Sequence, residues 1–100
     1  MRKIILLCSA GMSTSILTRN MRQEAEKMNY KCTIDAYALS EAVNVANDAD
    51  FILLGPQVRY QLNTIVQKFQ HCPVEAINAT DYGMVNGKKI MEYVKNVLGD

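Results

Sequence analysis

Hydrophobic and polar residues form blocks along the chain, and each block has the period of either a strand or a helix. Short continuous apolar runs alternate with longer segments in which apolar residues lie three or four positions apart. The predicted strands are Arg2–Cys8, Lys31–Ala38, Asp50–Gly55 and Val74–Asn78, and the predicted helices are Ser13–Met28, Ser40–Asn47, Arg59–Gln70 and a last helix that Asn86 caps and Gly99 ends. This alternation predicts an α/β fold, a single three-layer domain whose four-stranded parallel sheet carries helices on both faces.

The strand patterns also predict which strands are central. Ile4–Cys8 and Phe51–Leu54 are apolar at every position, which is typical of strands buried on both faces. Lys31–Ala38 alternates between apolar and polar residues, so we expect it at an edge of the sheet. From the helices, the residues expected to face the core are Leu17, Met21, Ala25, Met28, Leu39, Val43, Ala46, Leu62, Ile65, Val66, Phe69, Ile90, Met91, Val94, Val97 and Leu98.

Composition narrows the classes of function. The 100 residues are 49% hydrophobic and 21% charged, as in a globular domain, and eleven basic against ten acidic residues give a net charge of +1. Because this charge provides no broad cationic surface, we expect no nucleic-acid partner. No apolar run approaches the roughly 18–20 residues of a membrane helix, so we expect no direct membrane insertion.

The cysteines do not fit a disulfide framework or a metal site. Cys8, Cys32 and Cys72 are odd in number and widely spaced, which favours reduced thiols and a cytoplasmic protein. His71 and Cys72 are adjacent, but no further ligands stand at a suitable spacing, so we expect no metal. Cys32 and Cys72 are interpreted as small packing residues.

Three loops at the carboxyl ends of the strands are the candidates for chemistry, because ligands of open α/β sheets bind there. They are Cys8–Ser13, Gly55–Arg59 and the segment Ala79–Val85, which is predicted to be a loop.

The first loop is the most informative. Cys8 is the last residue of an apolar strand, and mostly small residues lead from it into a helix. Inward-facing amides of such a loop, with the positive end of the helix dipole, would hold a phosphate and stabilise a thiolate. Cys8 is then a nucleophile placed to attack phosphorus and form phosphocysteine. The residues expected to bind the phosphate are Ser9, Ala10, Gly11, Met12, Ser13, Thr14 and Ser15.

One position argues against hydrolysis. A cysteine-dependent phosphatase carries an arginine six residues after its cysteine, where this chain has Thr14. Without that forked cation the loop suits a carrier that keeps its phosphoryl group away from water. The alternatives are a phosphatase or arsenate reductase on the same scaffold, a flavin- or nucleotide-binding module, and a Cys8 that only fills the core. A receiver domain is disfavoured because its acidic cluster is absent.

Three motifs resemble one family. They are Lys3–Ser15 (KIILLCSAGMSTS), Leu53–Tyr60 (LLGPQVRY) and Asp81–Gly87 (DYGMVNG). Together they resemble the IIB component of the bacterial phosphoenolpyruvate-dependent sugar phosphotransferase system (PTS), of the lactose/cellobiose/chitobiose type, over essentially the whole chain.

The resemblance implies one IIB-type domain over residues 1–100, with a fold similar to that of small tyrosine phosphatases. It implies a phosphorelay without a cofactor: Cys8 accepts a phosphoryl group from a phosphohistidine of the IIA component. Cys8 then passes it to a sugar bound by the membrane component IIC, so that the protein works in the cytoplasm, transiently at the inner face of the membrane. Gln57, Arg59 and Tyr82 are further candidates for contacts with the phosphate or a partner. The alternatives are an amide that stabilises the turn for Gln57, a solvated side chain for Arg59 and a partly buried structural residue for Tyr82.

Overall fold

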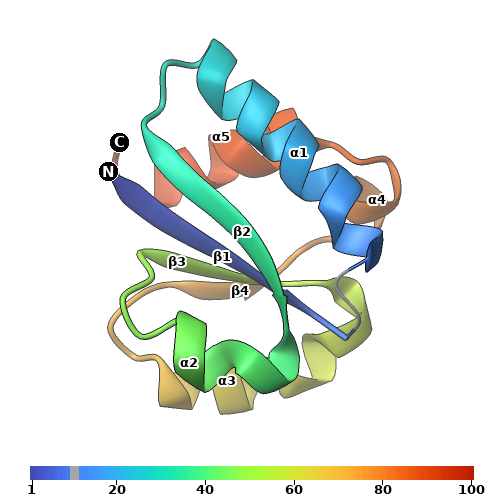
Figure 1. Cartoon of the computed structure of the whole chain (residues 1–100), viewed down its shortest axis with the longest axis vertical. Coiled ribbons are helices and arrows are strands. Elements are labelled where there is room, and N and C mark those ends of the chain that lie inside the picture. Colours follow the sequence, from blue (N-terminus) through green and yellow to red (C-terminus); the bar gives the residue numbers. More distant parts are fainter. Residues whose placement is uncertain (10–11) are drawn as a thin grey trace.

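A parallel sheet of four strands lies at the centre of the structure, a computed structural model that describes residues 1–9 and 12–100, with the backbone alone at residues 12–14. The described elements are β1 (Arg2–Cys8), α1 (Met12–Lys27), β2 (Cys32–Ala38), the 3₁₀ helix η1 (Leu39–Glu41), α2 (Ala42–Val45), β3 (Phe51–Leu54), the 3₁₀ helix η2 (Pro56–Gln61), α3 (Leu62–Lys68), β4 (Val74–Ala76), α4 (Ala79–Gly83) and α5 (Gly87–Val97). The strand order is β2-β1-β3-β4 (Figure 1). The predicted fold class is confirmed, including the edge position of β2.

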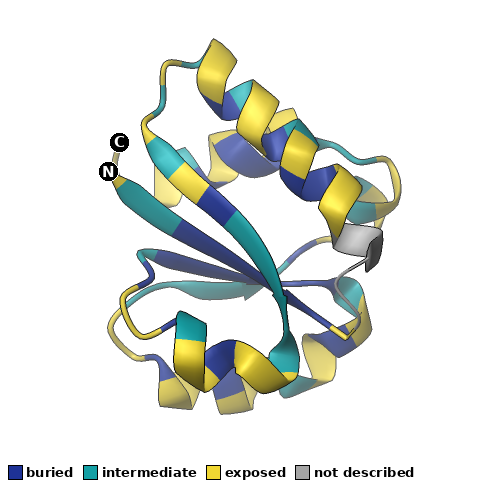
Figure 2. Cartoon of the chain, viewed as in Figure 1, coloured by how far each residue is buried: buried dark blue, intermediate teal, exposed yellow. Residues whose placement is uncertain are grey.

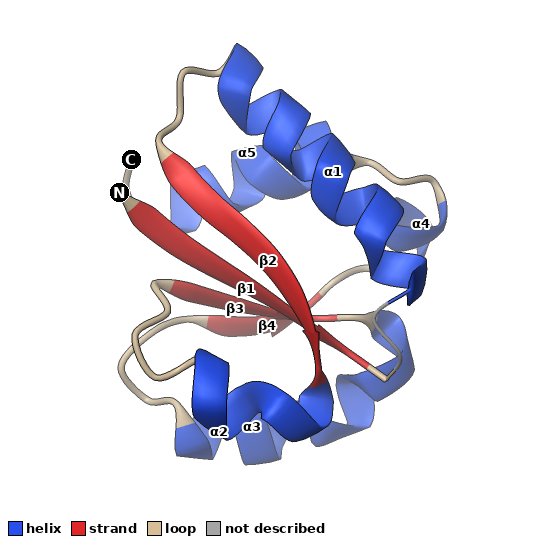
Figure 3. Ribbon diagram, viewed as in Figure 1, coloured by secondary structure: helices blue, strands red, loops and turns tan. Residues whose placement is uncertain are grey.

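Two apolar layers hold helices against the sheet. Successive residues of a strand point to opposite faces, so Ile4 and Leu6 pack towards α1 and α5, while Ile5 and Leu7 pack towards α2 and α3. Figure 3 shows the strands between these two pairs of helices, and Figure 2 shows the buried centre of the sheet. β1 and β3 are thus buried on both faces, as their continuous apolar runs predict.

The helical stripes are largely as predicted, with three exceptions. Val43, Val66 and Val97 are exposed rather than turned towards the core, with 54%, 41% and 39% of their surface accessible. The helices around the first two are short, and the buried stripe there is narrow. At α3 it consists of Ile65 and of Phe69, the residue that follows the helix, so the neighbouring Val66 points to solvent.

Local hydrogen bonding explains where the element boundaries differ from the prediction. Ala79–Val85 is not wholly a loop: the Asn78 side chain accepts hydrogen bonds from the backbone N–H groups of Thr80 and Asp81, and this cap starts α4. Ser40 makes no capping hydrogen bond, and the chain there forms η1 before the single turn of α2. The helix predicted from Arg59 begins earlier, as η2.

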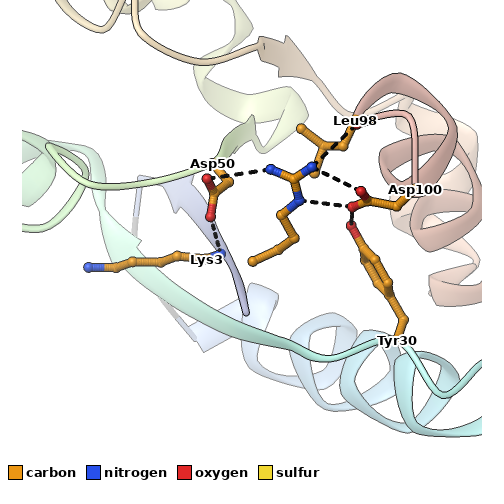
Figure 4. A network of polar contacts seen from close by, with 6 residues as sticks. Lys3, Tyr30, Asp50, Leu98 and Asp100 are labelled. Carbon is orange, nitrogen blue, oxygen red and sulfur yellow. Dashed lines mark hydrogen bonds and ion pairs between the residues drawn. The ribbon is translucent and has the colours of Figure 1, made fainter.

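A polar network lies at the amino-terminal edge of the sheet, at the opposite end from Cys8 (Figure 4). The guanidinium of Arg2 donates two hydrogen bonds of 2.9 Å to the carboxylate of Asp100, which also accepts one from the hydroxyl of Tyr30. Arg2 also pairs with Asp50 at 3.8 Å, and the Asp50 carboxylate accepts a hydrogen bond from the Lys3 backbone N–H. The network therefore joins the start of β1 to the segments just before β2 and β3 and to Asp100, three residues beyond the end of α5.

Candidate functional site

Three segments meet at the carboxyl-terminal edge of the sheet. They are the chain after Cys8 at the end of β1, the chain from Gly55 after β3, and the chain from Asn78 after β4. β1 and β3 are adjacent, with Leu7 paired to Leu54, so the first two segments leave the sheet next to each other. The topology therefore brings together the ends of the loops selected from the sequence.

Cys8 ends the central strand β1, where Ala38 of β2 is its paired residue. The residue is buried, with 1% of its surface exposed, and its thiol donates a hydrogen bond of 3.8 Å to the carbonyl oxygen of Tyr37. This hydrogen bond ties Sγ to the edge strand β2. The loop that the sequence predicts to face the sulfur begins at Ser9 and continues into residues outside the described part of the chain.

The helix that follows Cys8 supplies an electrostatic feature. α1 begins at Met12, four residues after Cys8, and its first turn contains no acidic residue. The partial positive charge of the helix N-terminus is therefore not neutralised from within the helix. An anion bound to Sγ would be stabilised by this charge.

The predicted phosphate-binding residues are only partly described. Ala10 and Gly11 lie outside the described residues, as do the side chains of Met12, Ser13 and Thr14. Ser9 is an exposed residue directly after β1. Ser15 is also exposed and lines a shallow groove between α1 and β2, together with Tyr37.

Gln57 lies beside Cys8 through an intervening glycine. A β-carbon placed on Gly55 would stand 2.7 Å from Oε1 of Gln57 and 3.5 Å from Cβ of Cys8. The side chains of Gln57 and Cys8 therefore approach the same point of the backbone from two segments. Of the residues proposed beyond the first loop, Gln57 is the one whose side chain the structure places near Cys8, through their shared closeness to Gly55.

Arg59 and Tyr82 differ in their surroundings. Arg59 is exposed on η2 and forms no ion pair within the described part of the chain. Tyr82 is half-buried in α4 and packs against the core layer between the sheet and helices α1 and α5. Its neighbour Asp81 pairs with Lys89 of α5 at 3.6 Å. Tyr82 thus has a packing role, and the Asp81 carboxylate is directed at α5.

The other two cysteines are structural in their surroundings. Cys32 and Cys72 are free thiols that pack against the two core layers. Burial raises the pKa of Cys32, and burial together with the charge of Asp50 raises the pKa of Cys72 to about 11. Both thiols are therefore protonated near neutral pH and poorly nucleophilic. No group of three metal-ligating side chains is found among residues 1–9 and 12–100.

Exposed apolar side chains occur on the segments that surround the site, a feature that the sequence patterns did not identify. Ile16 of α1, Tyr60 of η2 and Met84 after α4 have 58%, 75% and 74% of their surface exposed. Each lies on a segment that follows the carboxyl end of a different strand, β1, β3 or β4, and Cys8 lies at the carboxyl end of β1. The sequence signal that could have identified them is an apolar residue that lies outside the stripe facing the core.

The described helices include none that is both long and apolar enough to cross a membrane.

Solved structures with this fold define the class of protein. The lactose-specific IIB domain of the phosphotransferase system from Streptococcus pneumoniae superposes with a TM-score of 0.83 over 95% of both chains, at 17% identity. The cellobiose-specific phosphotransferase IIB component from Borrelia burgdorferi gives a TM-score of 0.79 over 98% of this chain and 92% of its own, at 34% identity. The fold is that of PTS IIB domains.

Sequence comparisons identify the family. Residues 3–93 match the family model described as PTS system, Lactose/Cellobiose specific IIB subunit, and the chain belongs to this family. It is 33% identical over 100 residues to the oligo-beta-mannoside-specific EIIB component of Bacillus subtilis (strain 168), covering 98% of this chain and 97% of that protein. The cellobiose-specific EIIB component of Lactococcus lactis subsp. lactis (strain IL1403) is 31% identical over 102 residues, with coverages of 95% and 94%. The family resemblance predicted from the three motifs is confirmed.

Proposed function

We propose that this chain is a phosphoryl carrier that acts through Cys8, with residues 1–100 as one IIB-type domain. A phosphohistidine of a IIA component donates the phosphoryl group, and a β-linked disaccharide of the cellobiose, chitobiose or lactose type, held by a membrane IIC component, accepts it. The protein works in the cytoplasm and reaches the inner face of the membrane only through IIC. The observation that carries the proposal is the position of Cys8 at the end of a central strand, just before the N-terminus of α1.

Two in-line displacements complete the relay. In the first, the Cys8 thiolate attacks phosphorus, the S–P bond forms, and the P–N bond to the IIA histidine breaks, leaving its electron pair on the imidazole. In the second, a hydroxyl oxygen of the sugar attacks phosphorus and the S–P bond breaks, returning the electron pair to sulfur. The hydroxyl proton goes to a base on the acceptor side. No redox change or cofactor is needed.

Electrostatics at the end of β1 support the covalent intermediate. The phosphoryl group on Sγ carries negative charge, and the N-terminus of α1 provides the positive end of a helix dipole without acidic residues in its first turn. The position where a phosphatase places its arginine is Thr14. The binding site therefore retains the phosphoryl group without the cation that promotes its transfer to water.

The exposed apolar residues around the site support docking of two partners in turn. Ile16, Tyr60 and Met84 present exposed apolar surface, and the exposed Arg59 directly precedes Tyr60 on η2. Aromatic residues, methionine and arginine are enriched in protein interfaces. A shared face around Cys8 would also explain how a partner excludes water during transfer.

Reconstitution of the complete relay tests the proposal. Phosphoenolpyruvate, the general PTS phosphotransferases, candidate IIA proteins and membranes containing IIC are combined with this chain and cellobiose, chitobiose or lactose. We expect sugar phosphate to form with the native chain and with the Cys32→Ser and Cys72→Ser variants, but not with Cys8→Ser. Formation of sugar phosphate by a correctly folded Cys8→Ser variant would disprove the role of Cys8.

The fold similarity to small tyrosine phosphatases keeps one alternative function open to test. A phosphatase would hydrolyse p-nitrophenyl phosphate with steady turnover that depends on Cys8. We expect no turnover beyond a single equivalent, because Thr14 leaves the transferring phosphoryl group without a forked cation. Continuous turnover would favour the phosphatase.

A further inference from the structure

Gly55 occupies a backbone conformation that does not require glycine. Its φ of −61° and ψ of 152° are extended values accessible to any residue. Gly55 is nevertheless buried at the end of β3, between Leu54 and the first residue of η2. The dihedral angles therefore do not require a glycine at this position, whereas the space around the residue limits the size of its side chain.

The space next to Gly55 is filled by the amide of Gln57. A β-carbon on Gly55 would lie 3.5 Å from Cβ of Cys8 and 3.6 Å from the carbonyl oxygen of Leu7, which are ordinary contacts. It would lie only 2.7 Å from Oε1 of Gln57, which is closer than packed atoms approach each other. The missing side chain therefore makes room for the Gln57 amide beside Cys8.

The backbone under this amide is fixed in place. The N–H of Gly55 donates to the carbonyl oxygen of Leu7 at 2.8 Å, and the carbonyl oxygen of Gly55 accepts from the N–H of Val58 at 3.0 Å. Val58, a residue of η2, is buried in the core layer that also contains Leu7. Pro56 is the first residue of η2, and its ring fixes the φ angle there. The turn that carries Gln57 is thus anchored on both sides, to the strand that ends in Cys8 and to the core.

We propose that Gln57 is a phosphoryl-binding residue: its side-chain amide, rotated so that Nε2 instead of Oε1 faces Cys8, donates a hydrogen bond to the phosphoryl group on Cys8. This inference rests on the proposed carrier function. An amide has two N–H donors and no charge, so it orients the phosphoryl oxygens for in-line attack without supplying the cation that a hydrolytic enzyme uses. Gly55 has the complementary role: because it lacks a side chain, it leaves space for the Gln57 amide next to Cys8.

Two single variants test the proposal from opposite directions. Gln57→Leu removes the amide, and Gly55→Ala retains it but displaces it, because the added methyl group meets only the end of a flexible side chain at short distance. In the isolated phosphoprotein we expect both variants to change the ³¹P chemical shift of phosphocysteine. We expect each to lower the maximal rate of transfer from phospho-IIA about three- to tenfold, the usual effect of one lost hydrogen bond.

Coupling between the two sites gives a sharper result. Because both changes remove the same contact, the double variant should be no slower than the slower single variant. Gln67→Leu, which alters an exposed glutamine on α3, is the matched control and should leave the shift and the rate unchanged. Thermal unfolding of every variant establishes that the fold is retained.

The remaining outcomes overturn the inference in distinguishable ways. An unchanged ³¹P shift with a raised KM for phospho-IIA would make Gln57 a partner contact instead. Unchanged shifts and rates in both single variants would remove Gln57 from the site while the carrier function stands. If the native chain forms no phosphocysteine at all, the carrier function fails and this inference fails with it.

Discussion

At the scale of single residues, Leu7 and Cys8 show that position along a strand distinguishes a core residue from a candidate catalytic residue. Leu7 and Cys8 are both buried, but Leu7 packs inside the layer under α2 and α3, whereas Cys8 is the last residue of the strand. The carboxyl end of a parallel strand next to a helix N-terminus is where a bound anion is stabilised. Chemistry is therefore expected at the end of the strand and not within it.

A substitution at Thr14 tests the proposed reason why a phosphoryl group on Cys8 would resist hydrolysis. Thr14→Arg places a guanidinium at the phosphatase spacing from Cys8, so the phosphorylated variant should lose its phosphoryl group to water at least about tenfold faster than the native protein. Thr14→Met, of similar length without charge, should lose it at the native rate. The loss is followed by intact-mass spectrometry of the isolated phosphoprotein. A slower or unchanged loss in the arginine variant would refute the explanation based on the missing cation.

The nucleophile stays a prediction from the sequence, while the structure adds part of its surroundings. The small residues after Cys8 and the helix that follows them mark Cys8 as the candidate nucleophile, because spacing along the chain is enough for that prediction. The orientation of Sγ towards Tyr37 depends on the neighbouring strand β2, which is 29 residues away in the sequence. The space left at Gly55 for Gln57 likewise depends on a three-dimensional approach, and the sequence shows there only a glycine before a proline.

At the scale of elements, α1 and α5 pack closely because Gly87 has no side chain. Its N–H donates to Oδ1 of Asn20 at 2.9 Å. A β-carbon there would collide with that oxygen and would lie 2.9 Å from the backbone nitrogen of Met21. Unlike the end of a side chain, this backbone cannot move aside without separating the two helices.

Gly87→Ala should therefore destabilise the protein by about 1–3 kcal/mol, the usual cost of overpacking a close contact. Urea unfolding measures the free energy. Gly83→Ala on α4 is the control, because a β-carbon there meets nothing within 4 Å and its φ is not positive. We expect it to leave stability unchanged or to raise it by up to about 1 kcal/mol. Equal effects of the two substitutions would contradict the close packing of α1 on α5.

Element boundaries were harder to predict where a single side chain forms hydrogen bonds with the backbone and so determines where a helix begins. The 16 residues of α1 carry a repeated apolar stripe, and the prediction was within one residue at both ends. α4 has five residues and no room for a stripe, so its start depends on one capping side chain, Asn78. Short elements of this kind are decided by single hydrogen bonds, which periodicity does not detect.

At the scale of the whole molecule, the Arg2 network closes the end of the sheet that lies away from the site (Figure 4). The hydrogen bonds from Arg2 and Tyr30 lower the pKa of Asp100 from 3.8 to about 2. A carboxyl group with a lowered pKa stabilises the folded state fully above its unfolded pKa, and loses that effect as the pH falls through its folded pKa. The contribution of Asp100 should therefore be present above about pH 4 and disappear near pH 2.

Asp100→Asn tests this linkage. The variant should be slightly less stable than the native protein at neutral pH, and the difference should shrink as the pH falls from about 4 to about 2. Thermal unfolding across this pH range measures it, with Glu92→Gln on the exposed side of α5 as the control. A stability difference that does not change with pH would argue against an ionised Asp100 in the network.

The Arg2 network and the candidate site lie at opposite ends of the sheet. The network of Arg2 lies at one end of the sheet, while Cys8, the start of α1 and the exposed Ile16, Tyr60 and Met84 lie at the other. The alternation of strands and helices was sufficient to predict this polarity, because all four strands run parallel. The exposed apolar residues were not predictable from it, since periodicity reports what faces the core.

The most direct measurement of the central claim is the mass of this chain after incubation with a phosphorylated IIA partner. The account predicts that one phosphoryl group is added to the native protein and to the Cys32→Ser and Cys72→Ser variants, and that fragmentation locates it on Cys8. Cys8→Ser should acquire no such group. A phosphoryl group of the same stoichiometry on the Cys8→Ser variant, or on another residue of the native chain, would contradict the account.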